Sequence, residues 1–142
     1  MKNKFDLPQR EIKFREWDKK RKVMLYPKFD DIGNLDWLHH DGKSETDKCV
    51  FMQFTGLHDK NGKEIWEGDI INLGDNWWEA AGPAGYDSPI QVVQWNEEHC
   101  GFDPFANYDC DCGVYYSSEM CEVIGNVFQN PELLKGKEQN EK

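Results

Sequence analysis

The sequence predicts an all-β protein: a small antiparallel barrel of SH3-like or related type, with long loops and little helix. Aromatic residues, six of them Trp, make up 13% of the 142 residues, and aromatic side chains are enriched in strands. Glycine, asparagine and aspartate recur at short intervals, as is typical of chains with many turns. Short apolar stretches lie between these turns, and little of the chain has the periodicity of an amphipathic helix.

The size of the chain fits one domain. We expect residues 1–134 to form this domain, and residues 135–142, which are all charged, amide or glycine residues, to form a disordered tail. The N-terminal segment lacks the apolar core of a signal peptide, and no later stretch approaches the ~18 apolar residues of a membrane span. The sequence therefore predicts a cytoplasmic protein that makes no membrane contact.

The N-terminal part of the chain predicts a hairpin. Residues 12–15 alternate apolar with basic side chains, a charged segment follows, and residues 23–26 have the pattern of the returning strand. Residues 27–48 are hydrophilic and rich in turn-forming residues, with Trp37 as an aromatic anchor. This composition predicts a long loop after the hairpin.

The centre of the chain predicts three strands joined by two sharp turns. Asn61-Gly62 is a strong two-residue turn signal because both residue types tolerate positive φ. A second turn at Glu67-Gly68-Asp69 places an aspartate where it can accept backbone hydrogen bonds. The predicted strands are residues 50–54, 64–66 and 70–73, and a second long loop follows at 74–89.

The C-terminal part predicts four more strands and one helical turn. Pro104 cannot donate to a central ladder, so the strand that contains it is assigned to an edge. Asn130-Pro131 is typical of a helix start, which predicts a last helical turn through Leu134. The four predicted strands are residues 90–95, 101–105, 114–116 and 122–128.

Three blocks of the sequence, in the same order, resemble the YopX family: Ile12–Asp18, Met52–Ile70 and Glu122–Leu134. The resemblance implies a small, mainly β protein encoded by a bacteriophage or prophage and located in the bacterial host cell. It implies no established molecular role and supplies no catalytic residue to carry over.

The charge of the chain is unevenly distributed. The net charge is −10, which disfavours indiscriminate binding to a phosphate backbone. Residues 1–28 hold ten basic and four acidic side chains, whereas residues 29–142 hold seven basic and 23 acidic ones. This asymmetry predicts either a local nucleic-acid patch or a basic segment that lies against the acidic remainder.

Neither a metal centre nor an active site is predicted. Five cysteines without an export signal indicate reduced thiols, and their spacing lacks the C-x₂-C pattern of a zinc knuckle. Two of the thiols are flanked by aspartates, which should raise their pKa and oppose nucleophilicity. We expect no cofactor and no enzyme activity. The weak metal candidates are His99, Cys100, Cys110, Cys112 and Cys121.

The acidic residues Glu64, Glu67 and Asp69 are open to two interpretations. They could act as a pair for general acid/base or cation chemistry, or they could belong to two structural turns. Three carboxylates within six residues of a hairpin are usually a solvated face, so the structural interpretation is preferred. Sequence motifs of hydrolases, zinc proteases, and nucleotide- and dinucleotide-binding enzymes are absent.

The sequence favours a non-enzymatic accessory protein that binds a host or phage protein or a second copy of itself. Trp77, Trp78 and Tyr86 in a glycine-rich loop are the candidate contacts, although they could instead cover one end of a barrel. Residues 64–134 contain no Lys or Arg, which favours a protein over a nucleic acid there. The alternative is a nucleic-acid-binding module on the hairpin of residues 10–28, with Trp17 or Tyr26 stacking on bases. Its phosphate-binding residues would be Arg15, Lys19, Lys20, Arg21 and Lys22.

Overall fold

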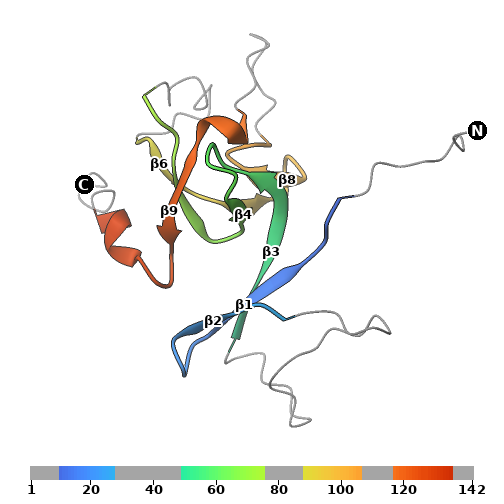
Figure 1. Ribbon diagram of the computed structural model, residues 1–142, viewed down its shortest axis with the longest axis vertical. Coiled ribbons are helices and arrows are strands. Elements are labelled where there is room, and N and C mark those ends of the chain that lie inside the picture. Colours follow the sequence, from blue (N-terminus) through green and yellow to red (C-terminus); the bar gives the residue numbers. More distant parts are fainter. Residues whose placement is uncertain (1–9, 28–48, 76–87, 107–116, 136–142) are drawn as a thin grey trace, which may run out of the picture.

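The computed structural model describes residues 10–27, 49–75, 88–106 and 117–135 (Figure 1). The strands of these ranges form a four-stranded sheet of order β2-β1-β3-β4, a three-stranded sheet of order β6-β5-β9 and a two-stranded sheet, β7-β8. The strands within these sheets pair antiparallel. The strands are β1 (Phe14–Asp18), β2 (Val23–Leu25), β3 (Cys49–His58), β4 (Glu64–Trp66), β5 (Asp69–Asn72), β6 (Ile90–Val92), β7 (Gln94–Asn96), β8 (Gly101–Asp103) and β9 (Glu122–Asn126).

The four-stranded sheet curls into a half-barrel. Its edges are β2 and β4, yet Tyr26, directly after β2, and Trp66, at the end of β4, have ring centroids 5.6 Å apart. A register shift in the β3–β4 pairing between Phe54 and His58 adds to the bend. The predicted fold class, an all-β protein of small-barrel type, is confirmed.

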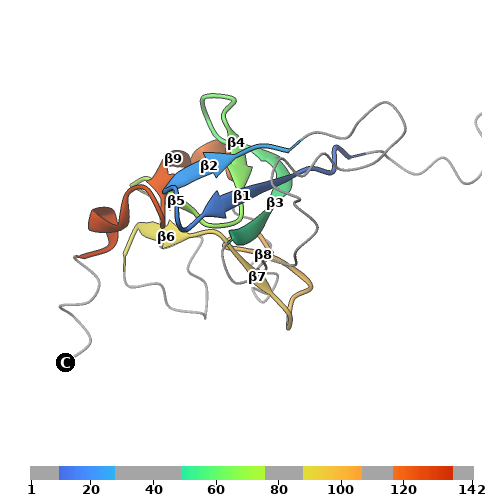
Figure 2. The same ribbon diagram turned by 90° about the horizontal axis from the view of Figure 1, so that it is seen from below.

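The three-stranded sheet packs beside this half-barrel. In the view of Figure 2, β1 and β2 lie in front of β5 and β9, and the ion pair of Arg15 with Asp69 joins β1 to β5. Contacts between side chains agree, since the Trp17 ring stacks on Phe128, just after β9, with centroids 5.4 Å apart. The core gathers apolar side chains from several strands, all at most 9% exposed: Ile65, Ile71, Leu73, Val93, Phe102, Cys121 and Val123.

The predicted strand at residues 90–95 is wrong as one continuous element. Val93 belongs to neither strand and exchanges hydrogen bonds with the start of β5 and the residue before it: its N–H donates to Asp69 O at 2.9 Å, and its carbonyl accepts from Gly68 N at 2.8 Å. The chain therefore passes from β6 in one sheet to β7 in another. Val93 is fully buried and both of its backbone groups are hydrogen-bonded. In the sequence it therefore cannot be distinguished from a residue of a regular strand.

The other predicted elements in the described ranges are found with shifted ends. Strand β3 runs to His58, beyond the predicted residue 54, and β8 ends at Asp103, just before Pro104. The predicted last helical turn is the 3₁₀ helix η3 (Pro131–Leu134), and a further 3₁₀ helix, η2 (Ser118–Met120), precedes β9. Most of the predicted loops 27–48 and 74–89, the strand 114–116 and nearly all of the predicted tail lie outside the described residues.

Among the described residues, no helix has the length and apolar character needed to span a lipid bilayer.

Candidate functional site

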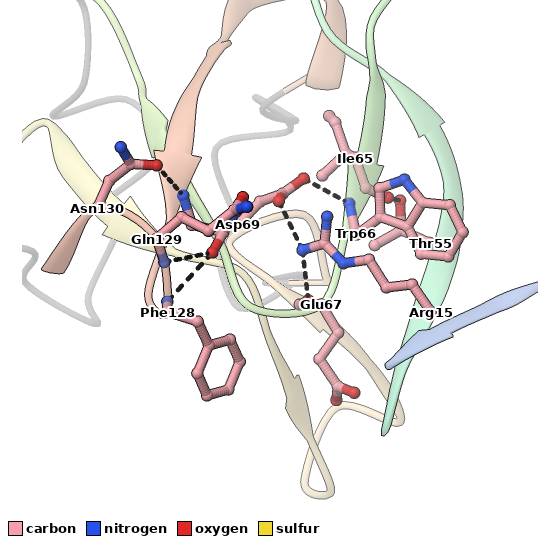
Figure 3. Close-up of polar contacts among 10 residues, drawn as sticks. Arg15, Thr55, Ile65, Trp66, Glu67, Asp69, Phe128, Gln129 and Asn130 are labelled. Atoms are coloured by element: carbon pink, nitrogen blue, oxygen red, sulfur yellow. Dashed lines mark hydrogen bonds and ion pairs between the residues drawn. The ribbon is translucent and has the colours of Figure 1, made fainter. Parts of the chain in front are cut away.

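A pocket of about 520 Å³ lies between the four-stranded and three-stranded sheets. We call it the inter-sheet pocket. Its wall includes side chains from β1, β4, β5 and the turn after β9, and Figure 3 shows how these groups converge. The residues that matter for its chemistry are Arg15, Lys63, Trp66, Asp69, Gln129 and Asn130.

The floor of the inter-sheet pocket is a buried ion pair. Arg15 Nη2 donates to Asp69 Oδ1 at 2.8 Å and to the carbonyl of Glu67 at 3.2 Å. The side chains of Arg15 and Asp69 are each only 4% exposed. Neither hydrogen bond uses Nη1, and the buried Nε has no partner among the described residues. The guanidinium is therefore anchored at one nitrogen and keeps unused donors.

Local sequence explains why Asp69 stands at this place. The turn before β5 contains Gly68 at φ +86°, a conformation that L side chains rarely adopt, so the chain can double back from β4 to β5. Asp69 Oδ2 then accepts from Trp66 N at 2.8 Å, as the sequence predicted for this turn. Burial raises the pKa of the Asp69 carboxyl, and Arg15 opposes this effect. Both oxygens accept hydrogen bonds, which is the pattern of an ionised carboxylate.

The opposite wall is the turn from Asn126 to Asn130, whose side-chain oxygens are used within the turn. Asn126 Oδ1 accepts from Phe128 N at 3.1 Å and from Gln129 N at 2.9 Å. Asn126 Nδ2 donates to Gln129 Oε1 at 2.7 Å, and Asn126 N donates to Asn130 Oδ1 at 3.2 Å. The amide groups of Gln129 and Asn130 thus have their oxygens occupied, while their NH₂ ends make no hydrogen bond to described residues.

Beside the inter-sheet pocket, Lys13 packs against the ring of Trp66, which lines the pocket, and against that of Phe54, which does not. Lys13 Nζ lies 4.6 Å from the Phe54 ring centroid and 5.6 Å from that of Trp66, and it pairs with Glu64 and Glu11. Burial alone would lower the pKa of Lys13, but its hydrogen bonds to Glu64 and Glu11 outweigh that effect and raise it. The Arg15 guanidinium also lies over Trp66, at 5.3 Å.

A second pocket, of about 420 Å³, adjoins the first. It shares Tyr26, Glu64 and Trp66 with the inter-sheet pocket. Its remaining wall has the apolar Ile12, Phe14 and Pro27 together with the ion pair of Lys13 and Glu11. We call it the apolar pocket. The two form one continuous groove, polar at one end and apolar at the other.

The five residues predicted to bind phosphate do not share one surface in the structure. Lys19, Lys20, Arg21 and Lys22 are exposed at the β1–β2 turn, which Asp18 orders by accepting from the backbone N–H groups of Lys20 and Arg21, both at 2.9 Å. Arg15 does not belong with them, because it is buried on the inner face of β1 and paired with Asp69. Trp17 is 6% exposed and stacked on Phe128, so its ring is not open to a base, whereas Tyr26 is 53% exposed.

Of the other predicted site residues, those that the structure describes do not form a common site. Trp77, Trp78, Tyr86, Cys110 and Cys112 lie outside the described residues. Cys100 is exposed and Cys121 is buried in the core, where burial, helped by Asp59, raises the pKa of its thiol to about 12. His99 Nδ1 lies 3.9 Å from Asp103 Oδ1, and both atoms are buried without a hydrogen bond to the described part of the chain. Within the described ranges, no three His, Cys, Asp or Glu side chains are grouped to hold a metal ion.

Of the acidic trio, Asp69 lies in the pocket floor and Glu64 in its wall, each paired with a cation, while Glu67 contributes its carbonyl to Arg15. Sequence reasoning did not find the pairing of Arg15 with Asp69 or the role of the Asn126–Asn130 turn. One signal was available: Arg15 stands two residues before Trp17, and in a strand such residues share a face.

Comparisons with known proteins agree with the family resemblance of the three sequence blocks. The family model described as "YopX protein" matches residues 13–135. The chain is also similar to a solved structure, that of protein EF1440 from Enterococcus faecalis, with a TM-score of 0.51 and 28% sequence identity. That similarity covers 89% of this chain and 99% of the other chain. No curated protein matches the sequence.

Proposed function

Because the chain belongs to the YopX family, whose model spans residues 13–135, we propose that it is an accessory protein of a phage or prophage that acts by binding and not by catalysis. We place its binding site in the groove formed by the inter-sheet pocket and the apolar pocket. Its partner is a host or phage protein, or a second copy of the chain, and we expect it to work in the bacterial cytoplasm.

The observation that carries this proposal is the chemical state of the groove. The carboxylates in its wall that the structure describes are engaged, Asp69 with Arg15 and both Glu64 and Glu11 with Lys13, so none of the three is set up as a free general base. The thiol of Cys121 is buried and neutral. What the groove offers is shape, aromatic surface and hydrogen-bond donors, which are the means of a binding site.

The test compares two surface variants. Gln129→Trp puts a bulky ring at the rim of the inter-sheet pocket, whereas Glu132→Trp makes the same kind of change on exposed η3, outside the residues that line it. Each tagged protein is purified from the bacterial host at low salt and analysed by native mass spectrometry. We expect a partner in whole-number ratio with wild type and Glu132→Trp, and its loss with Gln129→Trp. Equal capture by all three proteins would refute the groove as the site.

A second candidate function is nucleic-acid binding through the β1–β2 turn. The observation that favours it is the run of four exposed cations, Lys19 to Lys22, on a turn fixed by Asp18. Such binding would weaken steeply as salt is raised, and neutralising Lys20 and Lys22 would lower the salt slope by about 1 for each phosphate that a side chain no longer neutralises. Salt-independent binding would exclude this function.

A further inference from the structure

We infer that the groove binds the C-terminal carboxylate of a partner polypeptide, with the carboxylate in the inter-sheet pocket and a preceding side chain in the apolar pocket. The inference rests on the proposed binding function and names the chemistry of the partner. Three properties of the groove support it: the kind of hydrogen-bonding groups left open, a lysine that makes no ion pair with a described residue, and the shape.

The open polar groups at the inter-sheet pocket are mainly donors. Internal hydrogen bonds use both oxygens of Asp69 and the side-chain oxygens of Gln129 and Asn130. Within the described part of the chain, the groups left over are Arg15 Nη1 and Nε, Lys63 Nζ, Gln129 Nε2 and Asn130 Nδ2. A pocket that presents N–H groups and few acceptors is matched by a ligand that only accepts, and an oxyanion is such a ligand.

One further observation points to a missing acceptor. Arg15 Nε is buried and has no hydrogen-bond partner among the described residues, although an unpaired buried donor is destabilising. The Arg15 side chain is more than nine-tenths buried and lines the inter-sheet pocket. An oxyanion seated there would give the guanidinium a second anionic neighbour beside Asp69.

The lysine of the inter-sheet pocket favours a ligand that carries a single negative charge. The lining holds Arg15 and Lys63 together with Glu64 and Asp69, so its formal charges balance. Arg15 pairs with Asp69, and Glu64 pairs with Lys13, which lies outside this lining and also pairs with Glu11. Lys63 makes no ion pair with any described residue and is the cation left to meet an anionic ligand. A carboxylate carries one negative charge, whereas a phosphate monoester carries close to two at neutral pH and would be left partly uncompensated in this half-buried site.

The shape of the groove favours a chain end over a small free acid. The inter-sheet pocket continues past Tyr26 and Trp66 into the apolar pocket of about 420 Å³. Tyr26 is 53% exposed, a large ring surface that a partner side chain would cover. A polypeptide C-terminus provides both parts, an anionic end and an adjacent apolar side chain, and pairs of this kind are a recurring mode of peptide recognition.

The test measures binding of labelled peptides to the full chain by fluorescence polarisation. The probes are fluorescein-labelled Gly-Ser-Gly-Ser-X-X peptides with the last two positions randomised among apolar residues, made with a free C-terminal carboxylate and, separately, as the C-terminal amide. We expect the free-acid pool to bind and amidation to weaken binding at least about thirtyfold. Equal binding of both pools would overturn the inference.

A pair of lysine variants locates the contact. Lys63→Gln removes the cation that makes no ion pair with a described residue and should weaken binding of the free-acid pool about tenfold. Lys60→Gln changes the same charge three residues away, on a side chain that does not line the pocket, and should leave binding within about twofold. Equal effects of the two variants would show only a general response to charge and would count against the site.

Two further probes separate the other sources of an oxyanion. N-acetylphenylalanine that competes as well as the peptides would identify a small free acid, and an amidated peptide with an internal glutamate that binds as well would identify a side-chain carboxylate. Either result overturns the C-terminal assignment. If the peptides fail while Gln129→Trp still abolishes partner capture, the binding function stands and this inference falls.

Discussion

Asp59 joins the turn before β4 to strand β9, and its replacement by asparagine should destabilise the fold strongly. Its Oδ1 accepts from Asn61 N at 2.8 Å and from Lys63 N at 2.9 Å, and its Oδ2 accepts from Val123 N at 2.9 Å. The residue is only 4% exposed. One carboxylate thus orders a turn and ties it to the three-stranded sheet.

The size of the effect follows from hydrogen-bond geometry. Asparagine has one acceptor oxygen, so in Asp59→Asn an NH₂ group must face at least one backbone N–H. The variant loses one or more hydrogen bonds to a charged acceptor, about 1.5–3 kcal/mol each, and leaves a buried donor unpaired at a further cost of about 1–3 kcal/mol. We expect the free energy of unfolding to fall by about 3–5 kcal/mol at neutral pH.

The pH dependence of the free energy of unfolding tests the same contacts of Asp59. Burial alone would raise the pKa of Asp59, but the N–H groups of Val123, Lys63 and Asn61 outweigh it and lower the pKa below its ordinary value. A carboxyl whose folded pKa is depressed contributes stability that is present above the unfolded pKa, about 3.9, and is lost as pH falls through the folded pKa. Asparagine does not titrate. The difference in stability between wild type and Asp59→Asn should therefore shrink as pH falls below about 4.

Urea unfolding followed by tryptophan fluorescence at a series of pH values measures both effects. The matched control is Asp75→Asn, which makes the same substitution at an exposed position near the end of β5 and should change stability by less than about 0.5 kcal/mol. A loss in Asp59→Asn no larger than in this control, or a loss that is the same at pH 3 as at pH 7, would refute the reasoning.

Two further predictions concern a thiol and a glycine. Cys121 should resist iodoacetamide in the native protein at pH 8, where exposed Cys100 is modified, because burial raises the pKa of the Cys121 thiol to about 12; peptide mapping that finds equal labelling without denaturant would contradict this. Gly68→Ala should lower the free energy of unfolding by about 2–4 kcal/mol, since φ is +86° and a Cβ would lie 2.9 Å from Met52 Sδ. Gly62→Ala, at φ +78° but with open space, should cost only about 1 kcal/mol, and similar losses in urea unfolding would disprove the packing argument.

The fold class and most strand positions could be predicted because they depend on local signals. The turn at Asn61-Gly62 and the turn at Gly68 both need positive φ, and both glycines adopt it. Such residues indicate a turn whatever the rest of the chain does. The break at Val93 has no local signal, since a valine that leaves the ladder to pair with a turn in another part of the chain looks like any buried strand residue.

The inter-sheet pocket could not be predicted, because its groups come from positions far apart in the sequence. Arg15 and Asp69 are 54 residues apart, and Asp59 and Val123 are 64 apart. Which cation meets which carboxylate depends on how the sheets are placed, and the sequence holds many candidates of each kind. The Asn126–Asn130 turn is recognisable as a turn, but its unused NH₂ groups become a binding surface only opposite Arg15.

Which face of β1 is buried determines whether the basic residues of the N-terminal segment are exposed to solvent. Alternation of Ile12 and Phe14 with Lys13 and Arg15 suggests that the basic side faces solvent. The structure has the opposite arrangement: Arg15 is buried, Lys13 packs on Phe54, and Ile12 is 54% exposed. A shift of one residue exchanges the two faces of a strand.

The charge asymmetry of the chain therefore has two separate causes. Lys13 and Arg15 lie against Glu64 and Asp69 of the acidic remainder, so part of the basic excess is neutralised within the fold. The cations of the β1–β2 turn remain exposed. A nucleic-acid function must then rest on that turn alone, without Arg15 or a stacking Trp17. The groove, by contrast, has at one end Lys63, which makes no ion pair with a described residue, and unpaired donors, and it has aromatic surface at the other end; for that reason we propose the binding role there.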